Sequence, residues 1–358
     1  MPIKINTMEL IHLLEATPST QNIMLMGKHG IGKSQILSEF YTAKGFKVVP
    51  LFLGQMSDPG DLIGLLNKNE QTGKTEFMPP YWFPIDDTPV VLFLDELNRA
   101  RPEVLQTIMD LALNRTLAGR SLPKGSRIIS AVNNGDEYQL TDLDPALVSR
   151  FNIYEFCPTV NEWLLWAQKN SLDKRVIDFI SHNPDYLDSD GKKIEDGSLE
   201  KTPDRRGWER VSQIISQIKN LDNESKKIVA GIIGTKATSK FFEEIKKSNL
   251  INGMDLLTKD FNDAKSILIK YHTPEFAVLN DSIFRTLETT DFNDVQKKTA
   301  AKNLHNYFNF LESNSKREAM AHFANIFAGT KYPNTLMFII QNVPELYKKV
   351  TKYISEIK

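Results

Sequence analysis

Short apolar runs alternate with helical patterns over about the first 155 residues of the chain. The runs with strand character are Asn22 to Met26, Phe46 to Phe52, Val90 to Leu94, Ile128 to Val132 and a shorter one at Ile153 to Phe156. Between the third and fourth runs, Leu105, Ile108, Met109 and Ala112 fall on one face of a helix. Buried strands that alternate with amphipathic helices are typical of a parallel sheet covered by helices on both faces. The pattern therefore predicts an α/β domain.

The pattern changes after Pro158. Thr159 and Glu162 have capping-box spacing ahead of an apolar stretch at 163–166, and Lys-rich helical patterns dominate from there onward. We predict amphipathic helices at Asp291 to Leu311 and at Pro344 to Ile357, in a region without a functional motif. The predicted division is an α/β domain over residues 1–157, a helical domain over 158–272 and a helical C-terminal extension over 273–358.

Composition limits the number of domains, the kinds of partner and the cellular location expected for the protein. The chain has 358 residues and 41% of them are hydrophobic, which is enough for two or three domains. Its 44 basic and 45 acidic side chains give a net charge of -1, so the balance indicates neither nucleic-acid nor membrane binding. Cys157 is the single cysteine, and the six histidines lack metal-ligand spacing. Because no signal-peptide pattern or membrane-length apolar run is evident, we expect a soluble cytoplasmic protein.

A phosphate-binding loop follows the first apolar run. Its residues are Gly27, Lys28, His29, Gly30, Ile31, Gly32, Lys33 and Ser34, and a helical pattern comes directly after them. Glycines let the backbone curl around an anion and point N–H groups inward, and the positive end of the following helix adds to the attraction. In such a loop the lysine reaches the β and γ phosphates and the serine binds Mg²⁺. We therefore predict that Lys33 and Ser34 bind a nucleoside triphosphate with its Mg²⁺.

Polar side chains end the next two central strands. Asp95 and Glu96 follow the run at Val90 to Leu94, and Asn133 follows the run at Ile128 to Val132. Ligands bind at the carboxyl ends of parallel strands, so we predict that Asp95 holds Mg²⁺ through water, Glu96 polarises the attacking water and Asn133 orients it. The alternatives are a solvated turn for the two acids and an Asn that caps the turn over residues 133–136.

An arginine closes a short helical segment at residues 143–151. Arg150 follows the sequence Asp-Pro-Ala-Leu-Val-Ser. A planar, permanently charged guanidinium suits the charge that spreads over the γ-phosphoryl oxygens during transfer. The alternative is an ordinary helix-terminal arginine that interacts with the helix dipole.

Together these motifs resemble the Walker A, Walker B, sensor 1 and arginine-finger elements of AAA+ ATPases, and in particular of the MoxR group. The string Asp95-Glu96-Leu97-Asn98-Arg99-Ala100 is the most MoxR-like piece, with Asp58 to Gly64 and the helical stretch Trp163 to Ala167, and the resemblance covers about residues 20–215. It implies an AAA+ P-loop core, a helical lid over 158–272, ATP and Mg²⁺ as cofactors, and a homo-oligomeric ring, a hexamer. It also implies that Arg150 acts in trans on a neighbouring subunit and that Arg99 lies near that interface, although Arg99 is also consistent with a surface arginine.

The resemblance also implies a second sensor arginine at the start of a lid helix. The chain departs from the family pattern here, because two arginines, Arg205 and Arg206, follow Thr202, Pro203 and Asp204. Thr202 is a suitable N-cap and Pro203 a suitable first helical residue. Adjacent helical positions point about 100° apart, so only one of the two arginines is expected to reach the phosphates. Solvent-facing arginines are the alternative.

Tyr81, Trp82 and Phe83 form an aromatic cluster between prolines, ahead of the acidic pair. Exposed aromatics offer a large contact area to a polypeptide, whereas local packing is the more common role of such a cluster. Residues 67–74 are polar and predict a loop or hairpin tip.

The sequence therefore predicts an ATP-hydrolysing MoxR-like AAA+ ring that remodels a protein partner. By resemblance that partner is a von Willebrand factor A domain protein. Two other functions use the same ring: a nucleic-acid motor or restriction-associated translocase, which the near-neutral charge disfavours, and a slow nucleotide-dependent assembly scaffold.

Overall fold

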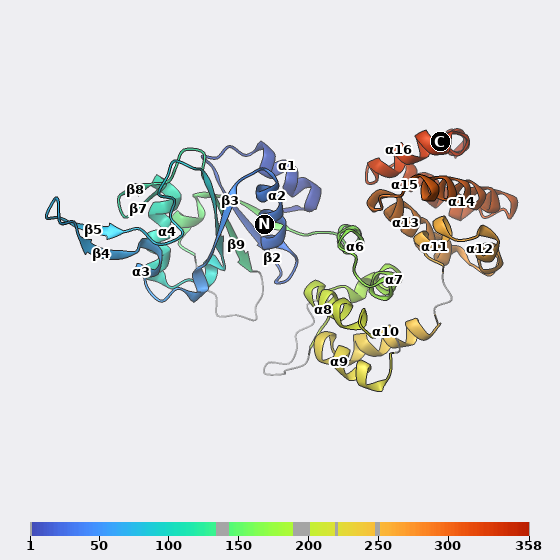
Figure 1. Cartoon of the computed structure of the whole chain (residues 1–358), viewed down its shortest axis with the longest axis horizontal. Coiled ribbons are helices and arrows are strands. Elements are labelled where there is room, and N and C mark those ends of the chain that lie inside the picture. The colour runs from blue at the N-terminus through green and yellow to red at the C-terminus, as the bar shows by residue number, and fades with distance from the viewer. Residues whose placement is uncertain (1, 134–142, 189–200, 219–220, 248–250, 358) are drawn as a thin grey trace. The chain divides into compact units, whose positions relative to one another are not determined.

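The computed structural model describes residues 2–357 apart from 134–142, 189–200, 219–220 and 248–250 (Figure 1). The chain divides into two compact units, Met1–Thr159 and Val160–Lys358. The border predicted after residue 157 lies two residues before this division.

The first unit is built on a six-stranded parallel sheet. In spatial order its strands are β1 (Ile3–Ile5), β10 (Phe151–Phe156), β2 (Asn22–Gly27), β9 (Arg127–Asn133), β6 (Val90–Asp95) and β3 (Lys47–Phe52). All five predicted strands are present, so the α/β class is confirmed. Strand β1 was not predicted, because it has three residues and only Ile5 is buried.

Helices cover both faces of this sheet, as the uninterrupted apolar strands predict. One core contains Ile23, Leu25 and Phe93 with residues of α1 (Thr7–Ala16) and α2 (Lys33–Ala43). The other contains Met24 and Leu92 with the apolar face of α4 (Pro102–Asn114). Successive residues of a strand thus point to opposite faces and are buried on both, which is why no polar alternation appears in the sequence.

Shorter elements lie between the central strands. They are η1 (Leu53–Gln55), α3 (Gly60–Ile63), the antiparallel pairs β4 (Leu65–Lys68) with β5 (Thr75–Met78) and β7 (Thr116–Leu117) with β8 (Arg120–Ser121), η2 (Leu97–Arg99) and α5 (Pro145–Val148). The polar residues 69–74 therefore form the predicted hairpin tip. In the aromatic cluster Trp82 and Phe83 are buried in the core, whereas Tyr81 is 96% exposed, so packing explains two of the three residues.

The second unit is helical. Its elements are α6 (Val160–Lys169), α7 (Lys174–His182), η3 (Pro184–Tyr186), α8 (Arg205–Ile215), α9 (Asn223–Ile233), α10 (Thr235–Lys247), α11 (Gly253–Thr258), α12 (Phe261–Leu268), α13 (Thr273–Thr289), α14 (Asp294–Ser313), α15 (Arg317–Ala328), α16 (Pro333–Asn342) and α17 (Pro344–Ile357). The two amphipathic helices predicted near the C-terminus correspond to α14 and α17. None of the helices among the described residues is long and apolar enough to cross a membrane.

Two hydrophobic cores divide this helical unit. One is formed by α6 to α10 around Trp208 and Phe241, and the other by α11 to α17 around Phe284 and Phe323. Helices α11 and α12 contribute Leu256, Leu257 and Leu268 to the second core. The chain therefore passes from the first core to the second near residue 250, whereas the sequence analysis predicted a division after residue 272.

Candidate functional site

The phosphate-binding loop joins β2 to α2, as predicted. Gly32 is the N-cap of α2 with φ 92°, a left-handed conformation that glycine adopts without strain. A side chain on Gly27 would come within 2.7 Å of the Ile31 Cδ1 atom and 3.0 Å of the Phe156 carbonyl oxygen. Both glycines are therefore required by the backbone, and the loop between them presents residues 28–31 at the N-terminus of α2, where N–H groups and the helix dipole favour an anion.

Lys33 has a buried ammonium group, and only 6% of the residue is exposed. Its Nζ donates hydrogen bonds of 2.9 Å to the carbonyls of Gly27 and Lys28 and to Oδ1 of Asn133. Burial lowers the pKa of Lys33 to about 8, and the negative charge of Asp95 offsets part of that shift. A desolvated ammonium that, among the described residues, has no carboxylate in direct contact is well placed to receive phosphate oxygens.

Ser34 and Asp95 lie together, as the sequence predicts for a magnesium site. The Ser34 Oγ donates to Oδ2 of Asp95 at 3.1 Å, and Oδ1 of the same carboxylate accepts from the Glu96 amide at 2.9 Å. One hydroxyl and one carboxylate at the mouth of a phosphate loop are ligand types that suit Mg²⁺, which keeps several waters in protein sites. The residues present therefore fit a nucleotide with Mg²⁺.

Glu96 turns away from its neighbour Asp95. Its backbone is left-handed, with φ 56°, which is uncommon for a residue that has a side chain and typical of functional sites. The Oε1 atom of Glu96 accepts a hydrogen bond of 2.8 Å from Nη1 of Arg99. Arg99 was predicted to lie near a subunit interface or on the surface, and its ion pair with Glu96 was not predicted.

Asn98 belongs to the same motif, and its role was missed. It is buried, and its Nδ2 donates to the main-chain carbonyl of Asn133 at 3.1 Å. This bond attaches η2, the short element that follows Glu96, to the end of β9 that carries the predicted sensor. An amide in the string that follows the acidic pair was the available signal, because a neutral donor in a buried turn needs an acceptor.

Arg150 lies at the opposite end of the sheet from the phosphate loop. Strand β10 begins directly after it, and Phe151 pairs with Asn22 at the start of the parallel strand β2. The loop begins where β2 ends, at Gly27, so the two sites are separated by the length of this strand, about 17 Å. The Arg150 Nε is buried and has no hydrogen-bond partner among the residues that the structure describes, and its Nη1 donates to the Ala146 carbonyl.

The two arginines predicted for the lid, Arg205 and Arg206, differ in their surroundings within the second unit. Helix α8 begins at Arg205 and its N-cap is Asp204, whose side chain accepts from the Gly207 amide. The prediction of Thr202 as N-cap was therefore wrong, because a carboxylate closer to the helix fills that place. Arg205 is buried and forms an ion pair of 3.0 Å with Asp188, whereas Arg206 is exposed.

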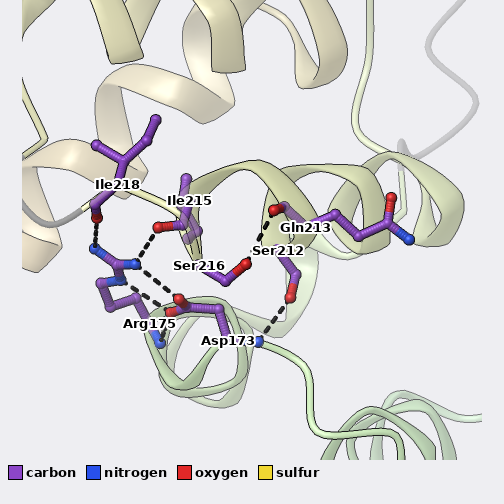
Figure 2. Close-up of polar contacts among 7 residues, drawn as sticks. All are labelled: Asp173, Arg175, Ser212, Gln213, Ile215, Ser216 and Ile218. Atoms are coloured by element: carbon purple, nitrogen blue, oxygen red, sulfur yellow. Dashed lines mark hydrogen bonds and ion pairs between the residues drawn. The ribbon is translucent and has the colours of Figure 1, made fainter.

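The end of α8 is fixed to α7 by Arg175 (Figure 2). The Arg175 guanidinium donates to the carbonyls of Ile215 and Ile218 and binds Asp173 at 2.7 Å. The hydrogen bond to Asp173 raises the pKa of Arg175. The Asp173 amide in turn donates to Ser212 Oγ at 2.6 Å, so α8 is held by both side-chain and main-chain contacts.

The six-stranded parallel sheet, with its glycine-rich loop between β2 and α2, has the fold of the P-loop class. Residues 22–151 match the AAA domain (dynein-related subfamily), a stretch that runs from β2 to the start of β10. This stretch of the first unit is therefore similar to the AAA domain of AAA+ ATPases.

Among proteins of known sequence, the chain is 28% identical to BssE of Thauera aromatica, a proposed chaperone, over 141 residues. These residues are 37% of this chain and 49% of BssE, so the match spans about half the length of that relative. Among solved structures, NtrX of Brucella abortus with ADP has 11% identity and a TM-score of 0.38, covering 77% of this chain and 63% of NtrX. A RuvB variant of Thermotoga maritima has 16% identity and a TM-score of 0.34, covering 69% and 75%. At these TM-scores, the two solved structures support no conclusion beyond the match of residues 22–151 to the AAA domain.

Proposed function

We propose that this protein is a MoxR-like AAA+ ATPase that binds ATP with Mg²⁺, hydrolyses the ATP within a ring of subunits and remodels a protein partner. The observation that carries the proposal is the meeting of Lys33, Ser34, Asp95 and Asn133 at the carboxyl ends of β2, β6 and β9. A buried ammonium, a hydroxyl, a carboxylate and a neutral amide at one edge of a parallel sheet are the groups that phosphoryl transfer requires.

Each residue then has one task. Lys33 binds the β and γ phosphates, and Ser34 and Asp95 hold Mg²⁺, which supplies neutralisation of the phosphate charge. Glu96 accepts the proton of the attacking water as general base. Asn133, whose Oδ1 accepts a hydrogen bond from Lys33, orients that water without adding charge.

The position of Arg150 is an argument for the proposed ring of subunits. At about 17 Å along the sheet it is too far from its own phosphate loop for a guanidinium to reach, since an arginine side chain extends about 7 Å. Its Nε has no partner within the described part of the chain, which is consistent with a ligand from outside the subunit. We therefore propose that Arg150 completes the site of a neighbouring subunit, in a ring that the family resemblance makes a hexamer.

For the lid we propose Arg206 as the second sensor. Arg205 is held by Asp188 within the second unit, so using it for phosphate binding would break a buried ion pair. Arg206 is the adjacent arginine. Its side chain is exposed, so it could bind phosphate without breaking the ion pair between Arg205 and Asp188.

The protein partner is proposed on two grounds. The partial relative BssE is a proposed chaperone, and the MoxR resemblance favours a partner with a von Willebrand factor A domain. If DNA or RNA raises ATP turnover severalfold, the protein is a nucleic-acid motor instead.

Two variants and one control test the nucleotide site. Lys33→Ala should abolish ATP binding measured by calorimetry, whereas Glu96→Gln should bind ATP and turn it over at least a hundredfold more slowly. Lys124→Ala, which changes an exposed lysine of the same unit, should behave as the parent in both assays. Equal turnover in Glu96→Gln and the parent would refute the assignment of the base.

A mixing experiment tests the action in trans. Arg150→Ala subunits alone should be inactive, and adding Lys33→Ala subunits should restore part of the activity, because the latter keep an intact arginine. Rings that exchange subunits freely and still show no rescue would contradict the proposal. A pull-down with Glu96→Gln and ATP would identify the partner.

A further inference from the structure

A buried amide holds the main chain of Arg150. Asn22, the first residue of β2, is 4% exposed. Its Nδ2 donates to the carbonyl of Arg150 at 3.1 Å and to the carbonyl of Ala112, in the last turn of α4, at 2.8 Å. An asparagine side chain has two N–H donors, so these two bonds use both of them. One side chain therefore ties the segment that carries Arg150 to β2 and to α4.

Arg115 fixes this amide from the other side. Its Nη2 donates to Oδ1 of Asn22 at 2.9 Å, so the Nδ2 end of Asn22 faces the two carbonyls. The Nη1 of Arg115 donates to the carbonyl of Ser126, the residue before β9, at 2.8 Å. The Ser126 Oγ in turn accepts from the amide of Val90, the first residue of β6. The beginnings of four strands and the end of α4 thus meet in one hydrogen-bonded cluster.

The start of β10 depends on this cluster because few strand contacts reach it. Phe151, the first residue of β10, pairs with Asn22 of β2, whereas β1 pairs with β10 only from Tyr154 onward. Among the strands that the structure describes, the part of β10 directly after Arg150 therefore has a single neighbour. The bond from the Asn22 side chain adds a restraint that the sheet alone does not supply.

The cluster lies at the edge of the sheet opposite to the phosphate loop. Asn22 begins β2, whereas the loop begins at the other end of that strand, at Gly27, so Asn22 and Arg115 cannot contact a nucleotide bound by their own subunit. The site residue that they can affect is Arg150. A displacement of about 1 Å in a group that must meet a reacting phosphate can cost about a hundredfold in rate.

We propose that Asn22 and Arg115 are positioning residues for Arg150: they fix the main chain from which its guanidinium extends into the nucleotide site of a neighbouring subunit. The inference rests on the proposed function and deepens it, because it gives two residues at the far edge of the sheet a part in the reaction of another subunit. A purely structural role would lower stability, and its effect would not depend on which subunit of a ring carries the change.

The first measurement is steady-state turnover together with ATP affinity, on the full chain. Asn22→Ala should lower turnover about tenfold or more and leave the Kd for ATP unchanged, because the phosphate loop of the same subunit is untouched. Arg115→Met keeps a long side chain without donors and should lower turnover by a smaller factor, since Asn22 then keeps its donors and loses only its orientation. Asn152→Ala is the matched control and should behave as the parent, because that amide lies two residues after Arg150 and donates to Gln21 Oε1.

The second measurement uses mixed rings. Asn22→Ala subunits should regain turnover with Lys33→Ala subunits, which supply a correctly held arginine to the intact phosphate loops of the former. With Arg150→Ala subunits they should stay inactive, because neither variant supplies a working arginine. Rescue by Arg150→Ala subunits would place the defect in the nucleotide site of Asn22→Ala itself and would overturn the proposal. Failure of Lys33→Ala subunits to rescue Asn22→Ala, in rings where they rescue Arg150→Ala, would overturn it as well.

Circular dichroism and thermal melting show whether each variant folds. If Asn22→Ala does not fold, Arg115→Met decides by the same two mixtures, because it leaves the buried amide in place.

The two proposals fail differently. If Arg150→Ala turns over ATP as fast as the parent, the proposed action in trans fails and the positioning role fails with it. If Arg150→Ala is inactive and rescued by Lys33→Ala, while Asn22→Ala and Arg115→Met turn over ATP as the parent does, the proposed function stands and only the positioning role is lost.

Discussion

Lys33 gives the sharpest thermodynamic prediction. Its pKa is lowered from the ordinary value of 10.5 to about 8, because burial disfavours the charged form more than Asp95 favours it. Between pH 8 and 10.5 the unfolded chain therefore binds more protons at this position than the folded protein does. The free energy of unfolding consequently rises with pH in that window.

The size of the effect follows from the same shift. Over the whole window the lowered pKa corresponds to about 3 kcal/mol, and a single site with these two values gains about 1.3 kcal/mol between pH 7 and pH 9. A triphosphate that binds only the charged lysine should bind about tenfold more weakly at pH 9 than at pH 7. Stability and affinity are thus predicted to change in opposite directions.

Chemical unfolding at a series of pH values, with nucleotide absent, tests the first part. Lys33→Met is the matched variant, because it keeps most of the side-chain length and cannot titrate. The difference between the parent and Lys33→Met should grow in favour of the parent as the pH rises above 8, since all other groups titrate equally in both. Calorimetry with ATP and Mg²⁺ tests the second part. A difference that stays constant from pH 7 to pH 10 would refute the reasoning about the buried charge.

Three further predictions concern the helical unit. Burial raises the pKa of Asp178 to about 6, so stability contributed by this site falls as the pH rises from 4 to 6, and Asp178→Asn should raise the unfolding midpoint at pH 7. Arg175→Ala should cost about 1–3 kcal/mol in a denaturant titration, because the carbonyls of Ile215, at the end of α8, and of Ile218, just beyond it, lose their donor. Arg206→Ala should reduce ATP turnover and leave the melting temperature unchanged, whereas Arg205→Ala should lower the melting temperature; the reverse pattern would exchange their roles.

The parts of the fold that could be predicted from the sequence are those with a local signal. Each central strand is a continuous apolar run, and Gly32, Lys33 and Asp95 follow such runs at fixed spacing, so strand order along the chain already indicated one edge of a parallel sheet. Strand β1 was not predicted, because its three residues are too few to show the alternation of a strand.

Contacts between distant segments could not be predicted in the same way. The hydrogen bond from Asn98 to the carbonyl of Asn133 joins residues 35 positions apart, and the space that Gly54 leaves for Glu96 depends on how η1 packs on η2. The sequence also does not show which helical core α11 and α12 join, because the apolar faces of these helices fit either core by pattern alone. The packing of side chains, and not the periodicity of the sequence, decides which distant segments come into contact.

The adjacent acids Asp95 and Glu96 show why the backbone at this site is strained. Both carboxylates follow one buried strand, and two like charges that shared the same small volume could not both stay ionised without a large cost. The left-handed conformation of Glu96 costs about 1–3 kcal/mol, yet it turns the chain so that Asp95 contacts Ser34 while Glu96 faces Gly54 and Arg99. Separate directions allow the two separate tasks that we propose, one for the metal and one for the proton. Asp95 also accepts from the Glu96 amide, so the carboxylate proposed to hold Mg²⁺ stabilises the turn that separates it from the proposed base.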